Sequence, residues 1–591
     1  MKKASACLLY FFSSIINAAA NFDISPTPGT TLPTTVPIDT VVSASYTITN
    51  RTQSTLSGYH ITGLPKTVTQ NTDTGNCPKR INLGAGESCI LILDIKGEAI
   101  SNFAICKGST CTSASVPLHV VATDEIPIPL KINVGVYSSS TGIRPLLALN
   151  TGGGDTWTYP SEPTFPDTTP AFVSGQYSST SCYNNLCIIT GFYSDGSIRR
   201  PLLGLSTDRG DTWTYPEDIT MPSITPAYAD SGHLWATDCN ARLCVAGGHY
   251  RDDTNNQYPL LARSSDGGGS WTFPEGIIEP NTTPEFQGNA SIRGTGCYGI
   301  RCLAAGHYFD ISNAQRPMVG LSTDAGQTWT YPITMTNPDT QPTFGTNGRV
   351  YSLAKCATDT FITTGFYVDG DGGIHRPLLG LSIDGGNTWT FPTSITQPET
   401  TPAFVDIGIL IVNGCSDNIC IASGRYNDGT TTRPLLAMST DACQTWTYPT
   451  SITEANLPVF QSGTLTGGAS CSGNLCIAVG SYVDDEDPRV RHPLLALSKD
   501  AGKTWTYPEA VINPDTTPKF QNTGQLFGAS CSGRRCIATG RYQAVDGLIH
   551  PLMAVTTDYG ATWTFPETIT DTSTIPDYVN NGRLGSGGIE E

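Results

Sequence analysis

The segment "LSTDAGQTWTYP", residues 321–332, places small polar residues directly before a tryptophan and a tyrosine. Successive tryptophans of similar segments are 56 to 60 residues apart. A repeat of this length is typical of stacked copies of one supersecondary unit. The eight tryptophans are Trp157, Trp213, Trp271, Trp329, Trp389, Trp446, Trp505 and Trp563.

One repeat, residues 524–566, shows the expected secondary structure. It contains four short apolar or alternating runs, "GQLFGASC", "CIATGRY", "PLMAVTT" and "TWTFP". The runs are separated by the turns "SGRR" and "DYGA" and by the loop "QAVDGLIH". Gly and Pro are abundant, at 61 and 41 residues, and no long run has a helical apolar period. Four short antiparallel strands in each repeat predict a β-propeller blade.

The polar half of the opening segment has the pattern S/T-x-D-x-G-x-T/S-W. Its Asp can accept hydrogen bonds from the backbone of its own turn, and its Gly can adopt a positive φ. We expect the Trp to pack between neighbouring blades, where it would bury on the order of 200 Å². The aspartates are Asp208, Asp266, Asp324, Asp384, Asp441, Asp500 and Asp558.

This pattern resembles the Asp-box, or BNR repeat, of sialidases and many other β-propellers. Seven copies fit well, whereas the first has Gly152 in place of Asp and the sixth has Cys443 in place of Gly. The resemblance implies a propeller fold and specifies no activity.

Eight repeats predict an eight-bladed propeller over residues 126–591. The first repeat lacks an inner strand before "PLKINVGVY" (129–137), and "NNGRLGSGG" (580–588) matches the inner strand of other repeats. We therefore expect the C-terminal strand to complete the first blade, because ring closure removes exposed sheet edges.

Two further segments precede the repeats. Residues 1–20 have two lysines, an apolar stretch that begins with Cys7, and three alanines, as a cleavable signal peptide does. Residues 21–125 contain alternating runs at 41–50, 89–95 and 116–123, which predict an immunoglobulin-like β-sandwich joined to the repeats by "DEIPIP". We expect a monomer that is secreted, periplasmic or at the cell surface.

The 19 cysteines fit an oxidising compartment. Local disulfides are favoured over zinc for the six C-x4-C pairs, which belong to different repeats. Phe361 occupies the position where a partner for Cys356 is expected, and Cys443 is the other unpaired cysteine of the repeats. These two cysteines form either a bridge to each other or two buried thiols. The predicted local pairs are Cys77/Cys89, Cys106/Cys111, Cys182/Cys187, Cys239/Cys244, Cys297/Cys302, Cys415/Cys420, Cys471/Cys476 and Cys531/Cys536.

Charge limits the choice of partner. The chain has 33 basic and 51 acidic residues, a net charge of −18, which argues against nucleic acid and anionic membranes. No run of 18 apolar residues predicts a membrane-spanning helix.

The candidate ligand-binding face carries two recurring features, an acid in Tyr-x-Asp and a basic residue before Pro. They form either a ring of cations for an anionic ligand or an Asp–Arg brace in each loop, and recurrence favours the brace. The acids are Asp195, Asp252, Asp310, Asp369, Asp428 and Asp484, and the basic residues are Arg144, Arg200, Arg316, Arg376, Arg433, His492 and His550. The loops "DGDGG" (369–373) and "DDED" (484–487) offer carboxylates for calcium but match no calcium-loop pattern.

These features favour a non-catalytic surface protein that binds a protein or a glycan and needs no cofactor. A sialidase-like or other glycoside hydrolase and a periplasmic assembly factor are the alternatives. The sialidase family uses three arginines, a tyrosine nucleophile supported by a glutamate, and an aspartate acid/base. No isolated tyrosine and glutamate stand out here, and no catalytic residue is predicted.

Overall fold

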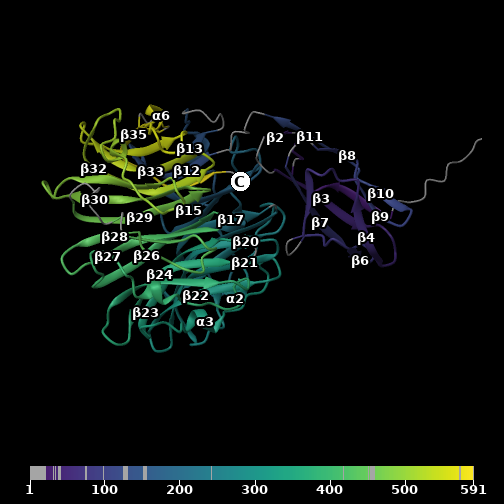
Figure 1. The fold of residues 1–591 in the computed structure, drawn as a ribbon, viewed down its shortest axis with the longest axis horizontal. Helices are drawn as coiled ribbons and strands as arrows, with labels where there is room; N and C mark the ends of the chain where they lie inside the picture. The colour runs from purple at the N-terminus through teal and green to yellow at the C-terminus, as the bar shows by residue number, and fades with distance from the viewer. Residues whose placement is uncertain are drawn as a thin grey trace, which may run out of the picture. The chain divides into compact units, whose positions relative to one another are not determined.

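The computed structural model describes residues 21–589, except 29, 31, 34, 38–41, 73–75, 97–98, 124–130, 151–155, 241, 358, 417, 450–451, 453–459, 571–573 and 575 (Figure 1). The chain divides into two compact units, Met1–Pro127 and Ile128–Glu591. The predicted signal peptide, the "DEIPIP" linker and Gly152 lie outside the described residues. No helix in the described part of the chain has the length and apolar character to cross a bilayer.

The first unit is built from short strands in three sheets around one core. Alternate residues of its long strands, including Tyr46, Ile48, Leu91 and Leu93, are fully buried in this core. The sheets have the orders β1 (Phe22–Pro26), β3 (Val42–Asn50), β7 (Ser88–Ile95), β5 (Val68–Asn71); β10 (Thr110–Ser113), β9 (Ala104–Lys107), β4 (Leu56–Thr62), β6 (Ile81–Leu83); and β2 (Thr35–Pro37), β11 (Leu118–Thr123), β8 (Ala99–Ser101).

The second unit repeats one antiparallel meander of three strands. Its first meander combines β35 (Tyr578–Ile589), β12 (Lys131–Ser139) and β13 (Gly142–Asn150). The others are β14 (Ser174–Tyr183), β15 (Leu186–Ser194), β16 (Arg199–Ser206); β17 (Asp230–Asn240), β18 (Leu243–Arg251), β19 (Gln257–Ser264); β20 (Phe286–Tyr298), β21 (Arg301–Asp310), β22 (Gln315–Ser322); β23 (Phe344–Lys355), β24 (Phe361–Asp369), β25 (His375–Ser382); β26 (Asp406–Ser416), β27 (Ile419–Asn427), β28 (Thr432–Ser439); β29 (Phe460–Ser472), β30 (Leu475–Asp484), β31 (Arg491–Ser498); and β32 (Phe520–Ser532), β33 (Arg535–Ala544), β34 (Ile549–Thr556).

The fourth strand expected in each repeat is reduced to one bridge. In the last repeat, Val555 pairs with Thr564, and the same pair recurs after the third strand of each described meander. The turn "DYGA" and the large Trp563 that follows leave only this short contact. The segments between meanders contain one-turn helices: η1 (Glu162–Thr164), α1 (Glu217–Thr220), α2 (Glu275–Ile278), α3 (Ile333–Thr336), α4 (Thr393–Thr396), α5 (Glu509–Ile512) and α6 (Glu567–Thr570).

The two ends of the second unit meet in one sheet. β35 pairs antiparallel with β12, and Leu584 lies opposite Gly135 (Figure 1). This pairing confirms the predicted position of the C-terminal strand. The first strands contact one another in the order β35, β14, β17, β20, β23, β26, β29, β32 and then β35 again. The unit is therefore an all-β arrangement of the propeller type.

Apolar side chains fill the space between consecutive meanders. Trp213, which is 4% exposed, shares one buried cluster with Ile132 and Leu147 of the first meander and Ile189 of the second. The middle strands are buried over most of their length, as in β30. Each meander therefore depends on its neighbours for a complete core.

The polar turn satisfies its own backbone groups. The Asp324 carboxylate accepts hydrogen bonds from Ser322 Oγ at 2.8 Å and from the Thr328 backbone N–H and hydroxyl at 2.9 and 2.6 Å. Gly326 has a φ of 80°, and its carbonyl accepts a hydrogen bond from the Trp329 indole at 3.0 Å. This geometry holds a polar turn and a buried indole within the same eight residues.

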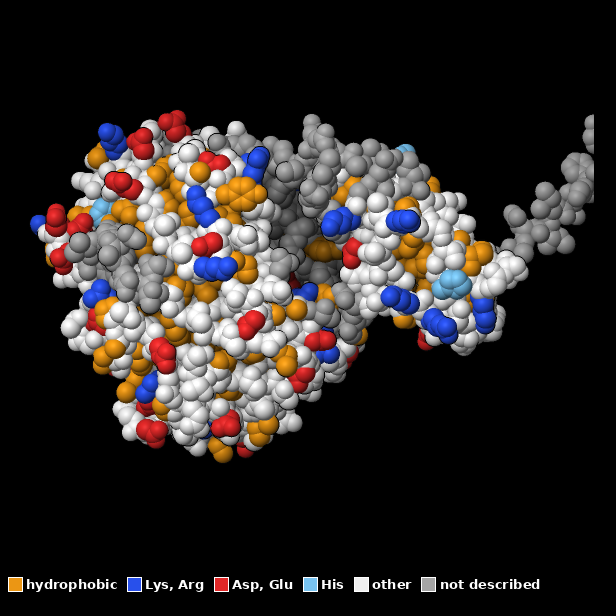
Figure 2. All heavy atoms as spheres, viewed as in Figure 1, with side chains coloured by type: hydrophobic (Ala, Val, Ile, Leu, Met, Phe, Trp, Pro, Cys, Tyr) orange, Lys and Arg blue, Asp and Glu red, His pale blue; other side chains and the backbone are white. Residues whose placement is uncertain are grey.

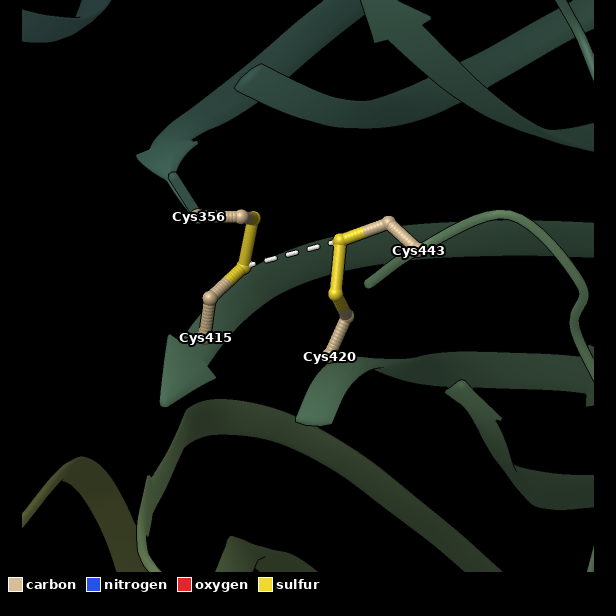
Figure 3. Close-up of side chains that lie close together, drawn as sticks. All are labelled: Cys356, Cys415, Cys420 and Cys443. Atoms are coloured by element: carbon tan, nitrogen blue, oxygen red, sulfur yellow. Dashed lines mark hydrogen bonds between the residues drawn. A yellow bond between two sulfur atoms is a disulfide. The ribbon is translucent and has the colours of Figure 1, made fainter. Parts of the chain in front are cut away.

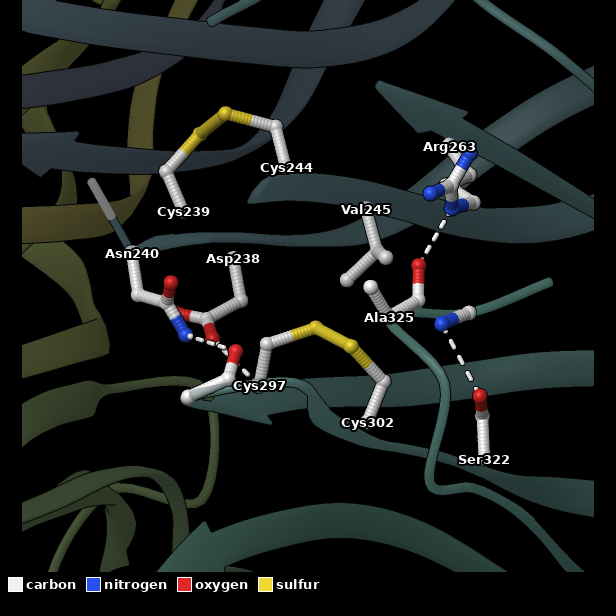
Figure 4. The surroundings of a disulfide bond; sticks show 12 residues. Asp238, Cys239, Asn240, Cys244, Val245, Arg263, Cys297, Cys302, Ser322 and Ala325 are labelled. Carbon is white, nitrogen blue, oxygen red and sulfur yellow. Dashed lines mark hydrogen bonds between the residues drawn. A yellow bond between two sulfur atoms is a disulfide. The ribbon is translucent and has the colours of Figure 1, made fainter. Parts of the chain in front are cut away.

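The turns also join the hairpins of neighbouring meanders. Around the Cys297–Cys302 disulfide, the Asp238 carboxylate accepts the Cys297 N–H at 2.6 Å, and Arg263 donates to the Ala325 carbonyl (Figure 4). The hairpin turn of one meander is thereby attached to the next meander.

Seven disulfides join the residues that the sequence pairs. They are Cys77–Cys89, Cys106–Cys111, Cys182–Cys187, Cys239–Cys244, Cys297–Cys302, Cys471–Cys476 and Cys531–Cys536.

The predicted Cys415–Cys420 pair is wrong, and so are both predictions for Cys356 and Cys443, a bridge to each other or two buried thiols. The structure joins Cys356 to Cys415 and Cys420 to Cys443 (Figure 3). The physical reason is proximity, because all four sulfur atoms lie within 4.8 Å of one another and several pairings are within reach.

Candidate functional site

The predicted acids and arginines form ion pairs inside single loops. The distances from arginine Nε to carboxylate oxygen are 2.6 Å for Asp195–Arg200, 2.8 Å for Asp310–Arg316, 2.7 Å for Asp369–Arg376 and 2.7 Å for Asp428–Arg433. Backbone N–H groups of the same loops also donate to these carboxylates. Each pair therefore stabilises the loop between the second and third strands, and the structure does not gather the pairs into one site.

Asp252 and Arg144 occupy the same loop positions but form no Asp–Arg ion pair among the described residues. Asp252 accepts hydrogen bonds from Thr254 and from the Asn256 N–H at 2.8 Å, and Tyr258 takes the place of the arginine. Arg144 donates to the Thr141 hydroxyl at 3.0 Å and lies over two aromatic rings.

Each of the two histidines has an acid of its own loop as a partner, and His492 Nδ1 also lies 3.2 Å from the carbonyl oxygen of Ile512 in α5. His492 lies 3.5 Å from Asp484, and His550 lies 2.9 Å from Asp546. Asp546 was not predicted, because it lies outside the Tyr-x-Asp spacing of the other repeats. The predicted basic residues thus differ in partner but share a position at the loop.

The tyrosines of the Tyr-x-Asp pattern anchor the segments between meanders. The Tyr308 hydroxyl donates to the Pro284 carbonyl at 2.8 Å, and Tyr250 and Tyr426 make the same bond to Pro226 and Pro402. Burial raises the pKa of Tyr308, so the phenol stays protonated at neutral pH. These tyrosines fix the loops and are not prepared as nucleophiles.

The two candidate calcium loops use their first carboxylates internally. Asp369 binds Arg376 and the backbone of Gly372 and Ile374, and Asp484 accepts the Glu486 N–H at 2.7 Å. Within the described ranges, the group that could hold a metal consists of cysteines and contains no carboxylate.

A different set of basic residues converges on the first strands. Register shifts in β17, β20 and β23 place Trp235, Arg293 and Tyr351 at irregular positions in successive meanders. His233, Arg293 and Arg349 of these first strands, with Arg199 of β16, His249 of β18 and His307 of β21, form what we call the basic cluster.

Aromatic rings orient the arginines of the basic cluster. The guanidinium carbon of Arg293 lies 4.3 Å from the Trp235 ring centre, and that of Arg349 lies 4.8 Å from the Tyr351 ring centre. Arg199 lies 4.3 Å from the ring centre of Phe192. Stacking on a ring face orients each guanidinium plane.

The histidines of the basic cluster are neutral at physiological pH. Burial, then His249, Arg293 and Arg199, lower the pKa of His233 to about 2. Burial, then Arg293 and Arg349, lower the pKa of His307 to about 3. The neighbours that lower these pKa values are themselves basic groups, which shows that the local potential is positive.

The arginines experience the same positive potential. Burial lowers the pKa of Arg293, and the charge of Arg349 lowers it further. Within the described part of the chain, neither arginine forms an ion pair with a carboxylate. Both side chains are half-buried, so part of each remains accessible.

Among the described residues, several buried polar atoms in this region have no hydrogen-bond partner. They include Arg349 Nε, His307 Nδ1 and the Ser291 hydroxyl. His307 is only 7% exposed, and His307 and Ser291 lie opposite each other in β21 and β20. A buried donor without a hydrogen-bond partner costs free energy, and an acceptor or an anion that binds beside it removes this cost.

A second group of arginines lies on the last meanders. Burial, then the charges of Arg583 and Arg491, lower the pKa of Arg541, which lies 5.7 Å from the Phe527 ring centre. Arg583 contacts Gln176 of the next meander at 3.4 Å. Unpaired positive charge thus recurs on both sides of the junction formed by β35.

Neither group was predicted from the sequence. The positions depend on bulges in the first strand, and a bulge changes which residues share a face. The signal that was present is the residue before the tyrosine in "GHY", "GHY" and "GRY", which lies at 249, 307 and 541.

Acidic and basic side chains are both scattered over the face of the second unit that Figure 2 shows. The full chain has a net charge of −18. The local excess of positive charge in the basic cluster is therefore opposite in sign to the net charge of the whole chain.

No family model and no curated protein matches the chain. Among solved structures, the GH74 enzyme of Niastella koreensis is 13% identical, with 73% of each chain covered and a TM-score of 0.33. The β-propeller domain of the Trilobed protease from Pyrococcus furiosus is 7% identical, covering 67% of this chain and 99% of that domain at a TM-score of 0.36. The Hadza microbial sialidase Hz136 is 9% identical, covering 81% and 99% at a TM-score of 0.27. Likenesses of this size do not indicate what the chain binds.

Proposed function

We propose that the chain is an exported, non-catalytic protein that binds an acidic glycan at the basic cluster of an eight-bladed Asp-box propeller. The observation that carries the proposal is the pair Arg293 and Arg349, which are half-buried, stacked on aromatic rings and without a carboxylate partner among the described residues. The N-terminal unit is an immunoglobulin-like sandwich in this proposal, and the protein acts as a monomer.

The eight-bladed architecture rests on the cyclic contacts of the first strands and on the pairing of β35 with β12. Each meander would be one blade, and the polar turn would be an Asp-box. In this arrangement the first strands line the axis, so the basic cluster lies near the centre of the ring.

The chemistry of the cluster favours carboxylate or sulfate groups as ligands. A guanidinium binds such a group through two parallel N–H bonds, and these bonds are strongest where water is partly excluded. A nucleic acid carries one phosphate charge per about 1.7 Å of duplex, and the net charge of −18 opposes so dense a polyanion. An oligosaccharide with acidic groups spaced along its chain suits separated arginines better.

The loop acids Asp310 and Asp369 are not prepared as general acids. Burial raises the pKa of each carboxyl group, but hydrogen bonds from the loop backbone and the paired arginine outweigh it and lower the pKa. A general acid for glycoside hydrolysis requires the opposite shift.

The proposal is tested by titrating the full chain with a short oligogalacturonate and with its methyl-esterified, neutral form. We expect binding of the acidic form only, and a loss of at least about tenfold in affinity when Arg293→Gln and Arg349→Gln are combined, since two charge-assisted contacts are removed. Arg489→Gln is the control, because the Arg489 side chain is 91% exposed and belongs to a surface pair.

Three results would contradict the proposal. These are equal binding of the neutral form, unchanged affinity in the double variant, and hydrolysis of the glycan that disappears when one loop acid is replaced. The last result would establish the glycoside hydrolase alternative. If the chain binds an acidic protein and no glycan, the result favours a protein partner. If it co-purifies with an envelope complex, the result favours the assembly role.

A further inference from the structure

The four cysteines 356, 415, 420 and 443 form a second candidate site. Cys415 and Cys420 lie opposite each other at the end of the β26–β27 hairpin, Cys356 follows β23 of the preceding meander, and Cys443 lies in the turn after β28. Their side chains point toward one another (Figure 3), and all four sulfur atoms lie within 4.8 Å of one another.

The hairpin alone does not require this arrangement. In the other five C-x4-C hairpins of the second unit, opposite cysteines form a local disulfide with Cα atoms 4.1 or 4.2 Å apart. Cys415 and Cys420 occupy the same register but make bonds to cysteines outside their hairpin. Two additional cysteines have therefore changed the chemistry at one hairpin of six.

Cys443 also occupies an unfavourable backbone position. Its φ is 66°, in the left-handed region, where the corresponding residues of other repeats are glycines such as Gly326 and Gly502. A residue with a Cβ pays roughly 1 kcal/mol or more for this conformation. The sulfur at this position bonds to Cys420 in the structure, and as a free thiolate it would lie beside the other three cysteines.

We propose that this cluster is a zinc site, in which four thiolates bind one Zn²⁺ when the chain folds with zinc before these thiols are oxidised. Sulfur atoms around tetrahedral zinc lie about 3.8 Å apart, given Zn–S bonds of about 2.3 Å. The Cys415 and Cys443 sulfur atoms, which are not bonded to each other, are 4.0 Å apart. The bonded pairs Cys356–Cys415 and Cys420–Cys443 would have to be reduced and move apart to reach the same spacing.

The ligand pattern fits a structural site. Cys415 and Cys420 provide a C-x4-C pair on a hairpin, within the C-x2–4-C spacing of such sites, and two distant residues complete the set. Cys420 and Cys443 are fully buried and Cys356 and Cys415 are half-buried, so an ion can enter and then be shielded.

The zinc-bound and disulfide forms are mutually exclusive. Zinc binding replaces four S–H bonds with four Zn–S bonds and releases four protons, without electron transfer. Formation of Cys356–Cys415 and Cys420–Cys443 instead removes four electrons and four protons, which a disulfide or oxygen must accept. Once both disulfides have formed, no thiolate remains for the metal.

The test uses the full chain produced in zinc-supplemented medium. Its metal content is measured by mass spectrometry, and its cysteines are alkylated before and after chelation. We expect one zinc per chain and four cysteines that become reactive only after chelation. Absence of zinc, with recovery of peptides joined through Cys356–Cys415 and Cys420–Cys443, would overturn the proposal.

Two variants localise the metal. Cys356→Ser removes one proposed ligand and should reduce bound zinc from one per chain to nearly none. Replacing both Cys471 and Cys476 with Ser removes a neighbouring hairpin pair and should leave zinc unchanged. Zinc that persists in Cys356→Ser, or is lost in the control, contradicts the assignment. Cobalt supplied to the natural chain gives a second readout, because its absorption distinguishes four thiolates from fewer.

Discussion

At the scale of single residues, buried indoles hold the repeats together. Trp505 is 1% exposed, donates to the Gly502 carbonyl at 2.9 Å, and packs with residues of both the sixth and seventh repeats. We expect Trp505→Ala to lower the free energy of unfolding by about 3–5 kcal/mol. Denaturant unfolding of the full chain measures this, and a change below about 1 kcal/mol would show that the indole does not link the repeats.

The histidines of the basic cluster make a prediction about pH. The pKa of His307 is lowered from 6.5 to about 3, chiefly by burial and then by Arg293 and Arg349. A group whose pKa is lower in the folded chain than in the unfolded chain contributes stability at pH values above its unfolded pKa. That stability is lost as the pH falls toward its folded pKa. Between pH 6.5 and about 4, we therefore expect the natural chain to lose more stability than His307→Gln does. Equal pH dependence of the two proteins in urea unfolding would contradict the neutral state of His307.

At the scale of elements, the polar turn combines charge with backbone geometry. Burial raises the pKa of Asp324, but hydrogen bonds from Thr328, Ser322 and Gln327 outweigh it and lower the pKa to about 2. We expect Asp324→Ala to cost about 1 kcal/mol at pH 7. This cost should shrink as the pH falls from about 4 toward 2, because the carboxyl takes up a proton in the unfolded chain near its ordinary pKa of 3.8 but in the folded chain only near 2. Urea unfolding at pH 7 and pH 2.5 measures both values, and a cost that grows in acid would refute the role of the charge.

Sequence patterns predicted the strands better than the site. The period of the tryptophans and the alternation within each repeat indicated the meanders, and the match of residues 580–588 to an inner strand predicted the partner of β12. The Asp–Arg braces followed from their recurrence, since each repeat brings its own pair together. These features lie within one repeat or recur in every repeat. Their spacing in the sequence is therefore enough to predict which residues come together.

The departures from the repeat could not be predicted in the same way. The bulges that place Arg293 and Tyr351 change the register of one strand, and the sequence shows no sign of where the extra residue is accommodated. The pairing of Cys415 and Cys420 depends on how Cys356 and Cys443 approach them in space. Contacts between repeats, and not within one, decide both outcomes.

At the scale of the whole second unit, the pairing of β35 with β12 joins the two ends of the chain segment. Removal of residues 578–591 would expose the β12 edge and the buried Leu584 site, and exposed edges promote association. We expect a lower melting temperature and formation of oligomers. A chain ending at residue 589 is the control. A monomeric truncated protein with an unchanged melting temperature would show that closure does not stabilise the unit.

The same closure places the first strands of all meanders in one ring of contacts, and the first strands β20 and β23 carry Arg293 and Arg349 of the proposed acidic-glycan site. The most direct measurement is a crystal structure of the full chain with a bound acidic oligosaccharide. We predict that a carboxylate of the ligand contacts the guanidinium of Arg293 or Arg349, inside a ring of eight meanders. A ligand bound only at the outer loops, or meanders that do not form a closed ring, would contradict this account.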